Sequence, residues 1–208
     1  MIKSCLIVFV RYPEADKVKT RLIPALGAEG SASVYKQMAE HTLAQVRELS
    51  LLKNVSVQIW FTGGSIAQMN DWLGDDLDYQ TQPKGDLGDR LLYAFQTAFS
   101  QGNESVIAIG TDCPSLSSSI LFQGFQALKY HPLILGPATD GGYYLIGMKQ
   151  LIPEVFNGIA WSTFEVLQQT VKIAKELGLG IAYLPTLTDI DTPEDLKIWE
   201  QVKANKRL

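Results

Sequence analysis

A cluster of basic residues follows the first apolar run of the chain. The run Leu6–Val10 is typical of a buried strand, and four cations and a hydroxyl come soon after it, namely Arg11, Lys17, Lys19, Thr20 and Arg21. In open α/β sheets, ligands bind outside the carboxyl ends of the strands, and Arg and Lys form charge-assisted hydrogen bonds with phosphate. We therefore expect this loop to bind a phosphorylated ligand. The alternative is a solvated basic loop, since the G-x-x-x-x-G-K spacing of a P-loop is absent.

An aspartate, Asp112, lies just beyond another apolar run, Ser105–Ile109. A carboxylate at the carboxyl end of a strand is well placed to hold a hard cation such as Mg²⁺ or Mn²⁺, which prefers oxygen ligands and bridges to substrate phosphates. The alternative is a turn aspartate that bonds its own backbone or caps the next helix. Several serines stand closer to that helix and can cap it, which leaves Asp112 available for a metal.

A second acidic segment precedes the last expected helix. Thr192 fits the N-cap of that helix, and Asp195 completes a capping box. Neither Asp189 nor Asp191 is needed to cap the helix. The two alternate with Ile190, so both point to one face of an extended stretch. Because two carboxylates on one face repel each other unless a cation joins them, they form a second candidate metal platform. An exposed acidic turn is the alternative.

Two other features have structural explanations. The segment Ser162–Glu165 has the spacing of a capping box and is expected to start a helix from Phe164. Cys113 stands next to Asp112, but no positioned base accompanies it, so we expect an unreactive thiol. With only one other cysteine, Cys5, and no C-x-x-C pair, the chain is expected to be a reduced, cytoplasmic protein.

Strand-like and helix-like segments alternate along the chain, which is typical of α/β folds. Apolar runs predict strands at 6–10, 55–61, 77–80, 105–109, 133–136, 143–148 and 181–184. Helical spacing predicts helices at 32–52, 91–99, 118–129, 164–177 and 193–203. The Asp140–Gly142 turn lies between two of the strands and is a hairpin signal, so an antiparallel element should join the sheet.

The composition is that of an ordinary globular protein, with 46% hydrophobic and 19% charged residues among 208. No linker or repeat divides the chain, so we expect one domain, 1–208. The formal net charge is −4 and the pI is near 5.2, which argues against a nucleic-acid-binding surface. The opening apolar run is far too short for a membrane span, so no membrane partner is expected. A negatively charged ligand would therefore need the local cations of the first loop.

Several motifs occur in an order that resembles a known family. They are Pro13, Lys19–Leu22, Gly85–Arg90, Gly110–Pro114, Asp140–Tyr144, Trp161–Thr163 and Asp189–Pro193. The chain resembles the glycosyltransferase-like family once described as a domain of unknown function, which includes rSAM/selenodomain-associated and arsenosugar-biosynthesis transferases. That family is related to the 2-phospholactate guanylyltransferases. The resemblance implies a GT-A-type nucleotide-diphospho-sugar transferase fold, a Rossmann-like three-layer α/β sandwich with a mostly parallel mixed sheet.

The resemblance also implies roles for residues at matching positions. The residues implied to bind the nucleotide are Arg11, Lys19, Thr20, Arg21, Gln82 and Gly85. The implied ligands of a Mg²⁺ or Mn²⁺ ion are Asp112 and Asp191. Those implied to border the acceptor are Asp140, Gly141, Gly142 and Trp161.

The first loop departs from the family pattern. Asp16 and Lys17 stand where Gly followed by Arg is usual, and Arg11 stands where Lys is more usual. A glycine would permit a positive φ and close approach of phosphate. Aspartate tolerates a positive φ better than most residues, but its negative charge opposes triphosphate binding. The Arg in place of Lys keeps its charge, although the two geometries differ.

We expect a transferase that acts on a nucleotide or nucleotide-sugar and a small-molecule acceptor. In glycosyl transfer, Asp112 and Asp191 would hold a metal that neutralises the departing diphosphate. Lys19 would assist, and Asp140 is the candidate base for the acceptor hydroxyl.

Two alternatives stay open. In nucleotidyl transfer, an acceptor phosphate attacks the α-phosphate of a nucleoside triphosphate and needs no base. The cationic loop favours that reaction, whereas the family labels favour glycosyl transfer, which we place first. A non-catalytic nucleotide-binding protein is the third hypothesis, which Asp16 favours and the pair of Asp112 and Asp191 opposes. A homo-oligomer is compatible with the sequence, which does not fix the oligomeric state.

Overall fold

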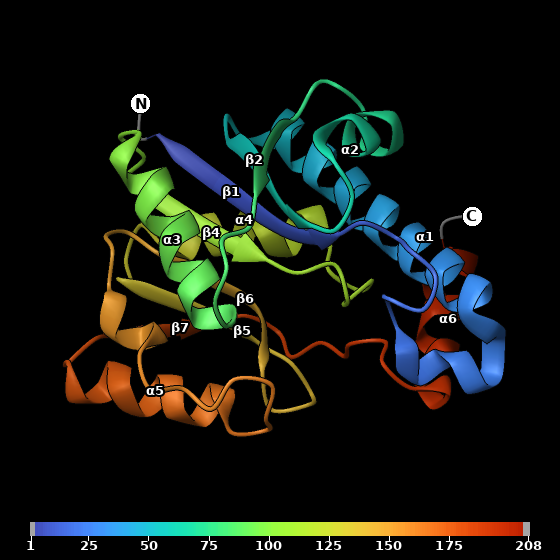
Figure 1. Ribbon diagram of the computed structural model, residues 1–208. Coiled ribbons are helices and arrows are strands. Elements are labelled where there is room, and N and C mark those ends of the chain that lie inside the picture. Colours follow the sequence, from blue (N-terminus) through green and yellow to red (C-terminus); the bar gives the residue numbers. More distant parts are fainter. Residues whose placement is uncertain (1–2, 206–208) are drawn as a thin grey trace.

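A seven-stranded mixed β-sheet forms the centre of the molecule (Figure 1). The computed structural model describes residues 3–205, so residues 1–2 and 206–208 of the expected domain lie outside the described residues. The strand order is β3-β2-β1-β4-β6-β5-β7, and β6 runs antiparallel to both of its neighbours. The strands are β1 (Ser4–Arg11), β2 (Ser56–Thr62), β3 (Asp78–Thr81), β4 (Ser105–Ile109), β5 (Leu133–Pro137), β6 (Tyr143–Met148) and β7 (Ile181–Tyr183). The mostly parallel mixed sheet expected from the sequence is confirmed.

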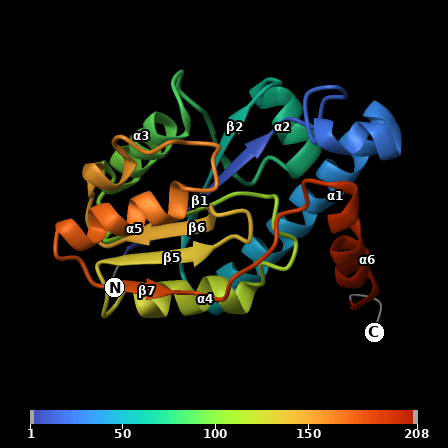
Figure 2. The ribbon, with the colours of Figure 1, turned by 90° about the horizontal axis from the view of Figure 1, so that it is seen from below.

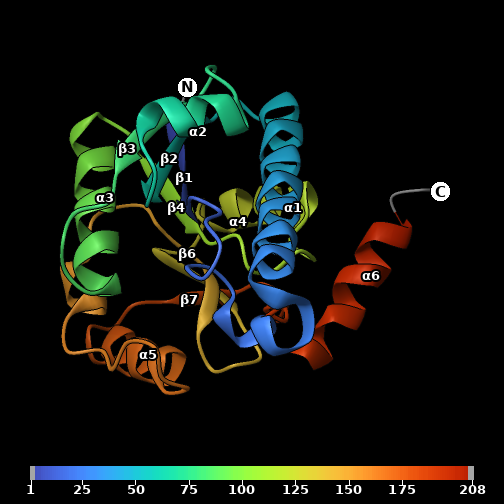
Figure 3. The same cartoon turned by 45° about the vertical axis from the view of Figure 1, so that its right-hand side comes forward.

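Helices cover both faces of the sheet (Figures 2 and 3). One face carries α1 (Ile23–Leu52), α2 (Ile66–Leu73) and α4 (Ser118–Ala127), and the other carries α3 (Leu87–Ser100) and α5 (Val166–Glu176). Helix α6 (Leu196–Asn205) lies outside α1, where the ring of Trp199 packs against that of His41 (Figure 3). None of the described helices is both long enough and apolar enough to cross a membrane. The helices on both faces of the sheet confirm the three-layer, Rossmann-like architecture expected from the sequence.

Strand β1 lies between β2 and β4, parallel to both, and it is buried on both faces because helices cover both faces of the sheet. Leu6 and Val8 pack into the core on the α1 side, whereas Cys5 and Ile7 pack into the core on the α3 side. A parallel strand with both faces covered has a continuous apolar sequence, as this one does. The register pairs Val8 with Ile109, so the carboxyl ends of β1 and β4 open at the same edge of the sheet.

The hairpin expected at Asp140–Gly142 is present and joins β5 to β6. Gly141 has a φ of 91°, a conformation that residues with a side chain seldom adopt. Strand β6 pairs with β4 as well as with β5, and Leu145 lies opposite Ile109. The antiparallel direction of β6 therefore brings the Asp140 turn to the carboxyl end of β4.

Two helices differ from the sequence expectation. Helix α1 begins at Ile23 rather than at residue 32, although Gly27 (φ 70°, ψ 170°) interrupts its first part. Helix α2 is not predicted by the sequence pattern. Ser65 caps it by accepting a hydrogen bond from the Gln68 backbone N–H, and Met69 packs into the core. Because α2 spans only about two turns, its apolar spacing is too short to identify it.

The prediction of a capping box at Ser162–Glu165 is wrong. Helix α5 begins at Val166, without a side-chain capping bond. Ser162 has a φ of 65°, whereas an N-cap residue takes an extended conformation. The Thr163 hydroxyl instead donates a hydrogen bond of 2.7 Å to the carbonyl of Ala160. The segment is therefore a tight turn that precedes the helix rather than its cap.

Gly147 offers a test of packing at the centre of the sheet. A Cβ at this position would lie 2.8 Å from Cγ1 of Ile107 and 2.8 Å from Cγ1 of Ile134, too close for carbon atoms. We expect Gly147→Ala to lower the free energy of unfolding by about 1–3 kcal/mol, the usual cost of overpacking a core. Gly110→Ala is the matched control, because a Cβ there meets no atom within 4 Å. Urea denaturation measures both changes, and equal costs would contradict this packing.

Candidate functional site

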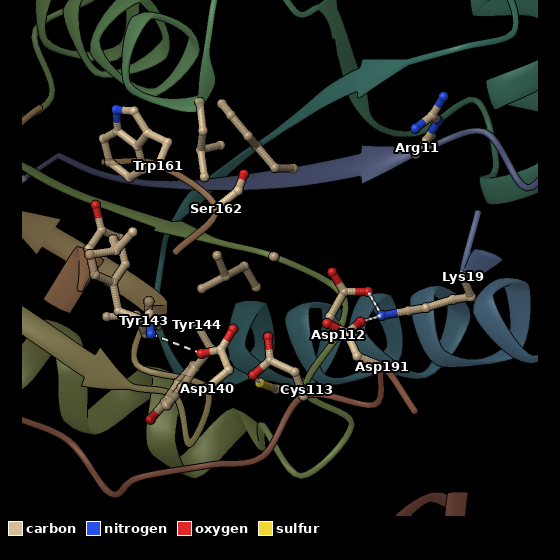
Figure 4. Close-up of a pocket in the computed structure, with 18 of the residues that line it drawn as sticks. Arg11, Lys19, Asp112, Cys113, Asp140, Tyr143, Tyr144, Trp161, Ser162 and Asp191 are labelled. Atoms are coloured by element: carbon tan, nitrogen blue, oxygen red, sulfur yellow. Dashed lines mark hydrogen bonds and ion pairs between the residues drawn. The ribbon is translucent and has the colours of Figure 1, made fainter. Parts of the chain in front are cut away.

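A pocket of about 790 Å³ opens at the carboxyl ends of β1 and β4. This volume is typical of small-molecule sites. Its walls come from the first loop, the end of β4, the Asp140 hairpin, the turn before α5 and the segment before α6 (Figure 4). The predicted site residues that line it are Arg11, Lys19, Thr20, Arg21, Asp112, Asp140, Gly142, Trp161 and Asp191. The structure thus brings together most of the residues that the sequence singles out.

Lys19 lies between the two carboxylates that are predicted to bind a metal (Figure 4). Its Nζ is 2.5 Å from Oδ1 of Asp112 and 2.8 Å from Oδ1 of Asp191. Arg21 makes a longer ion pair, with its Nη1 3.7 Å from Oδ2 of Asp191. The Lys19 side chain is 6% exposed, against 45% for Asp112 and 39% for Asp191. The ammonium group is therefore enclosed, while the carboxylates stay open to the pocket.

The first loop is anchored by apolar side chains on both sides of Lys19. Val18 and Leu22 are both buried. Lys19 itself has a φ of 47°, and the 3₁₀ turn Thr20–Leu22 begins directly after it. A non-glycine residue in the left-handed region persists where its surroundings hold it. The two buried neighbours and the two ion pairs are the contacts that hold Lys19.

The segment that carries Asp191 is fixed to the end of β4 by its backbone. The N–H of Ile190, a fully buried residue, donates a hydrogen bond of 2.9 Å to the carbonyl of Asp112. The Asp195 carboxylate accepts hydrogen bonds from the N–H groups of Asp191 (3.1 Å) and Thr192 (2.8 Å). These bonds determine where the Asp191 carboxylate lies relative to Asp112.

Asp112 and Asp191 suit a divalent cation both in their chemistry, because they offer carboxylate oxygens, and in their orientation. Both aim an oxygen at one point, which the Lys19 ammonium occupies here. Across residues 3–205, no group of three or more His, Cys, Asp or Glu side chains is placed to hold a metal. The pair would therefore supply two oxygen ligands, and ligand phosphates and water would complete the coordination, as is usual for Mg²⁺.

The charge state of Lys19 follows from the same contacts. Burial would lower the pKa of Lys19, but the carboxylates of Asp112 and Asp191 outweigh burial and raise the pKa above its ordinary value. Lys19 is therefore an ammonium ion at neutral pH. In this arrangement it cannot act as a proton acceptor.

Cys113 donates a hydrogen bond to Asp189, with Sγ 2.9 Å from Oδ1. Burial raises the pKa of the Cys113 thiol, and the charge of Asp189 raises it further, so the thiol stays protonated. Burial also raises the pKa of Asp189 to about 6, against the opposing effect of the Cys113 hydrogen bond. Asp189 and Asp191 both line the pocket, as their alternation predicts, but they have different partners.

On the opposite side of the pocket, the Asp140 hairpin forms a compact turn. Oδ1 of Asp140 accepts a hydrogen bond of 2.8 Å from the N–H of Gly142, which leaves Oδ2 available to a ligand. The carbonyl of Gly141 accepts a hydrogen bond of 2.9 Å from the N–H of Leu167, at the start of α5. A Cβ on Gly141 would collide with the backbone of Phe164, so Gly141 faces that segment instead of lining the pocket.

Trp161 packs against the ring of Tyr143 and against the first turn of α3. Its ring lies edge-on to that of Tyr143, with the centroids 6.4 Å apart. A Cβ on Gly88, in the first turn of α3, would collide with the indole and with the carbonyl of Phe156. The glycine in the Gly85–Arg90 motif therefore permits the close packing that positions Trp161 in the pocket wall.

Gln82 and Gly85 are not among the residues that line the pocket. Nε2 of Gln82 donates a hydrogen bond of 2.8 Å to the carbonyl of Trp60. The carbonyl of Gly85 accepts one of 3.0 Å from Nε of Arg90. Gln82 therefore binds the backbone of β2, and Gly85 binds a side chain of α3; their role in reading a base or ribose stays a prediction.

Asp16 adopts the conformation that the family glycine would permit. Its φ is 61°, and its side chain is exposed beside the pocket-lining Lys17. Aspartate tolerates this positive φ better than most residues do, so the departure from the family glycine keeps the backbone conformation. Its negative charge remains next to the expected phosphate site.

Sequence reasoning missed Tyr35 and the apolar part of the pocket wall. The Tyr35 hydroxyl accepts a hydrogen bond of 2.8 Å from the Arg11 N–H and is 3.2 Å from Oγ1 of Thr111. It therefore ties the end of β1 to the end of β4. In the sequence, Tyr35 belongs to the apolar stripe of α1 and looks like an ordinary core residue. The other missed lining residues include Phe9, Leu87 and Leu91, which likewise look like core positions.

Comparisons with known proteins identify the family of the chain and agree with its fold. A family model described as "Uncharacterized protein conserved in bacteria (DUF2064)" matches residues 43–163, more than half of the chain. A candidate nucleotide-diphospho-sugar transferase from Desulfovibrio desulfuricans G20 is 33% identical in sequence, and the match covers 92% of this chain and 84% of that one with a TM-score of 0.86. The comparison with curated proteins found no match.

Two more distant solved structures share the fold. One is 4-diphosphocytidyl-2C-methyl-D-erythritol synthase from Anaerococcus prevotii DSM 20548, with 11% identity, coverage of 95% of this chain and 96% of that one, and a TM-score of 0.63. The other is Rv0371c from Mycobacterium tuberculosis H37Rv in complex with manganese, with 12% identity, coverage of 94% and 97%, and a TM-score of 0.60. At these identities the likeness shows the fold alone.

Removal of the Tyr35 hydroxyl tests its role between the two strand ends. We expect Tyr35→Phe to lower the free energy of unfolding by about 1–3 kcal/mol, because the buried partners of the hydroxyl lose a hydrogen bond. Tyr130→Phe is the control, since Tyr130 is 82% exposed. Urea denaturation of both variants gives the comparison. If the two substitutions cost the same, the hydroxyl does not hold the strand ends together.

Proposed function

The chain belongs to the DUF2064 family, and on that premise we propose that it is a metal-dependent transferase that moves a glycosyl group from a nucleotide-sugar donor to a small acceptor. The observation that carries this proposal is the convergence of Asp112 and Asp191 on one point, which the ammonium group of Lys19 from the basic loop occupies. The match to a candidate nucleotide-diphospho-sugar transferase at 33% identity supports the donor class. The Rv0371c complex shows that a protein of this fold can bind manganese, which makes Mn²⁺ the ion to test.

In this proposal the residues act mainly by position and charge, as in other transfers from a phosphorylated leaving group. A divalent ion bound by Asp112 and Asp191 would supply positive charge to the departing diphosphate. Arg11 and Arg21 line the same pocket and would bind the phosphate oxygens. Asp140 is the candidate base, because one of its oxygens is held by its own turn and the other is available to an acceptor hydroxyl.

The pairing of the first-loop cations in the structure weakens the argument from the sequence for a triphosphate. From the sequence, the loop has a surplus of cations that would suit a triphosphate. In the structure, however, Lys19 and Arg21 are paired with Asp112 and Asp191. The surplus is therefore smaller than the sequence suggests, and nucleotidyl transfer stays the second candidate. Kinship with the 2-phospholactate guanylyltransferases, and membership of the arsenosugar or rSAM-associated subtype, also stay predictions.

Asp112→Asn tests the metal-dependent reaction. We expect turnover of a nucleotide-sugar with Mn²⁺ to fall at least about a hundredfold, because a transition-state charge loses its counter-charge. We expect the melting temperature without ligand to fall as well, because the enclosed Lys19 ammonium loses one of its two charged partners, so turnover is compared at a temperature at which both proteins are folded. Asp71→Asn, an exposed position on α2, is the matched control and should keep full turnover.

A ligand panel on the same two variants separates the candidate functions. Nucleotide-sugars and nucleoside triphosphates are added with Mn²⁺, and thermal stability is recorded. A ligand at a hundred times its Kd stabilises the native state by about 2.7 kcal/mol. A shift with nucleotide-sugars that is lost in Asp112→Asn supports the proposal, and a shift with triphosphates alone favours nucleotidyl transfer. If ligands bind without turnover in the wild type, the protein is a non-catalytic nucleotide-binding protein.

Removal of the Asp16 charge should strengthen phosphate binding by the first loop. We expect Asp16→Asn and Asp16→Gly both to tighten pyrophosphate binding by about threefold, more at low salt, because a repulsive charge is lost and both residues tolerate the positive φ. Glu104→Gln, at the amino end of β4, removes a charge at the other edge of the sheet and should have no effect. Titration calorimetry measures the affinities, and unchanged values would separate this loop from phosphate binding.

A further inference from the structure

The cation position between Asp112 and Asp191 is filled by the chain itself (Figure 4). Three of the four oxygens of these carboxylates face a cation: both Oδ1 atoms face Lys19, and Oδ2 of Asp191 faces Arg21. Oxygen ligands lie about 2.0–2.1 Å from Mg²⁺. An ion bound by both Oδ1 atoms would therefore need the volume that the Lys19 ammonium occupies. The ammonium and such an ion exclude each other.

The balance of charge leads to the same conclusion. Lys19 and Arg21 carry two positive charges and the two aspartates carry two negative charges, so the cluster is neutral as it stands. A divalent ion added to this cluster would meet two cations at short range, and both aspartates would already be paired. An ion that replaces Lys19 would instead meet one net negative charge. Metal binding is therefore favourable only after Lys19 has moved.

The position of Lys19 allows such a movement. Its side chain is enclosed, but Lys19, Thr20 and Arg21 all line the pocket, so a displaced ammonium would face a ligand there. Its backbone is in the left-handed region, which is stable only while its contacts persist. The ion pairs with Asp112 and Asp191 are among those contacts. Loss of the pairs removes part of what keeps the loop in this conformation.

We propose that Lys19 is an internal counter-ion that competes with a divalent cation for Asp112 and Asp191, and that an anionic ligand admits the metal by drawing the ammonium away. This inference rests on the metal role proposed above for the two aspartates. Its consequence is coupling: metal and anionic ligand strengthen each other's binding by the same factor. Without the ligand, the site keeps its own cation and binds the metal weakly.

The first experiment measures Mn²⁺ alone, with no nucleotide present. We expect Lys19→Met, which keeps most of the side-chain volume, to bind Mn²⁺ at least about tenfold more tightly than the wild type, because a competing cation is lost. Electron paramagnetic resonance of free Mn²⁺ gives the affinities. Lys17→Met is the matched control: it removes one charge from the same loop, and Lys17 makes none of the ion pairs with Asp112 or Asp191 described above. It should change the affinity by at most about twofold.

The outcomes of this experiment are distinct. An increase confined to Lys19→Met supports the competition. Equal or weaker Mn²⁺ binding by Lys19→Met overturns it, and so does the absence of binding by every variant, since two freed carboxylates would then form no metal site. Because no nucleotide is used, a failed transferase assay would leave the result unaffected.

A second experiment uses the wild-type protein and so does not depend on the folding of a variant. Lysines are acetylated briefly with and without Mn²⁺, and the labelled sites are quantified by mass spectrometry. We expect Lys19 to be protected without metal, since its side chain is 6% exposed and doubly ion-paired, and to be labelled several-fold faster with Mn²⁺. The exposed Lys17 serves as the internal reference. Unchanged labelling of Lys19 at saturating Mn²⁺ would overturn the proposal.

Discussion

The ion pairs of Lys19 are the interaction on which the arrangement of the pocket depends. They join the first loop to the end of β4 and to the segment before α6, and Lys19 and Asp191 are 172 positions apart in the chain. A lysine enclosed to this degree requires partners, because an unpaired buried charge is strongly unfavourable. The three segments must therefore meet at this point, and the walls of the pocket follow from their meeting.

The apolar framework makes that meeting possible. The central strands β1 and β4 are buried on both faces and are in register, so their carboxyl ends share one edge. The antiparallel β6 then returns the Asp140 turn to that edge. Two glycines permit close approach around the pocket: Gly88 lets Trp161 pack against α3, and Gly141 lets the hairpin contact the turn before α5. Backbone geometry and the absence of side chains thus shape the site as much as its charged groups do.

Much of the architecture could be predicted from the sequence, because strands buried on both faces are continuous apolar runs and the Asp-Gly turn indicates a hairpin. The position of Asp112 at a strand end could be predicted for the same reason. The ion pairs of Lys19 with Asp112 and Asp191 could not be predicted. A lysine in a phosphate-binding sequence context and an aspartate far along the chain carry no sign of their contact, since it depends on the packing of both segments. The role of the Tyr35 hydroxyl could not be predicted either, because Tyr35 belongs to the apolar stripe of α1 and has the sequence pattern of a core residue.

The distribution of backbone strain argues that the pocket is a ligand site and not merely a gap between loops. Within residues 3–205, three non-glycine residues have a positive φ: Asp16, Lys19 and Ser162. Lys19 and Ser162 line the pocket, and Asp16 precedes the pocket-lining Lys17. Each such conformation costs on the order of 1–3 kcal/mol and persists only where the surrounding structure holds it. A protein that used the fold only as a scaffold would have no need to concentrate this cost around one cavity. The strained residues lie beside the cations, the paired carboxylates and Trp161. Strain and charged groups gathered around one cavity are typical of a preorganised ligand site.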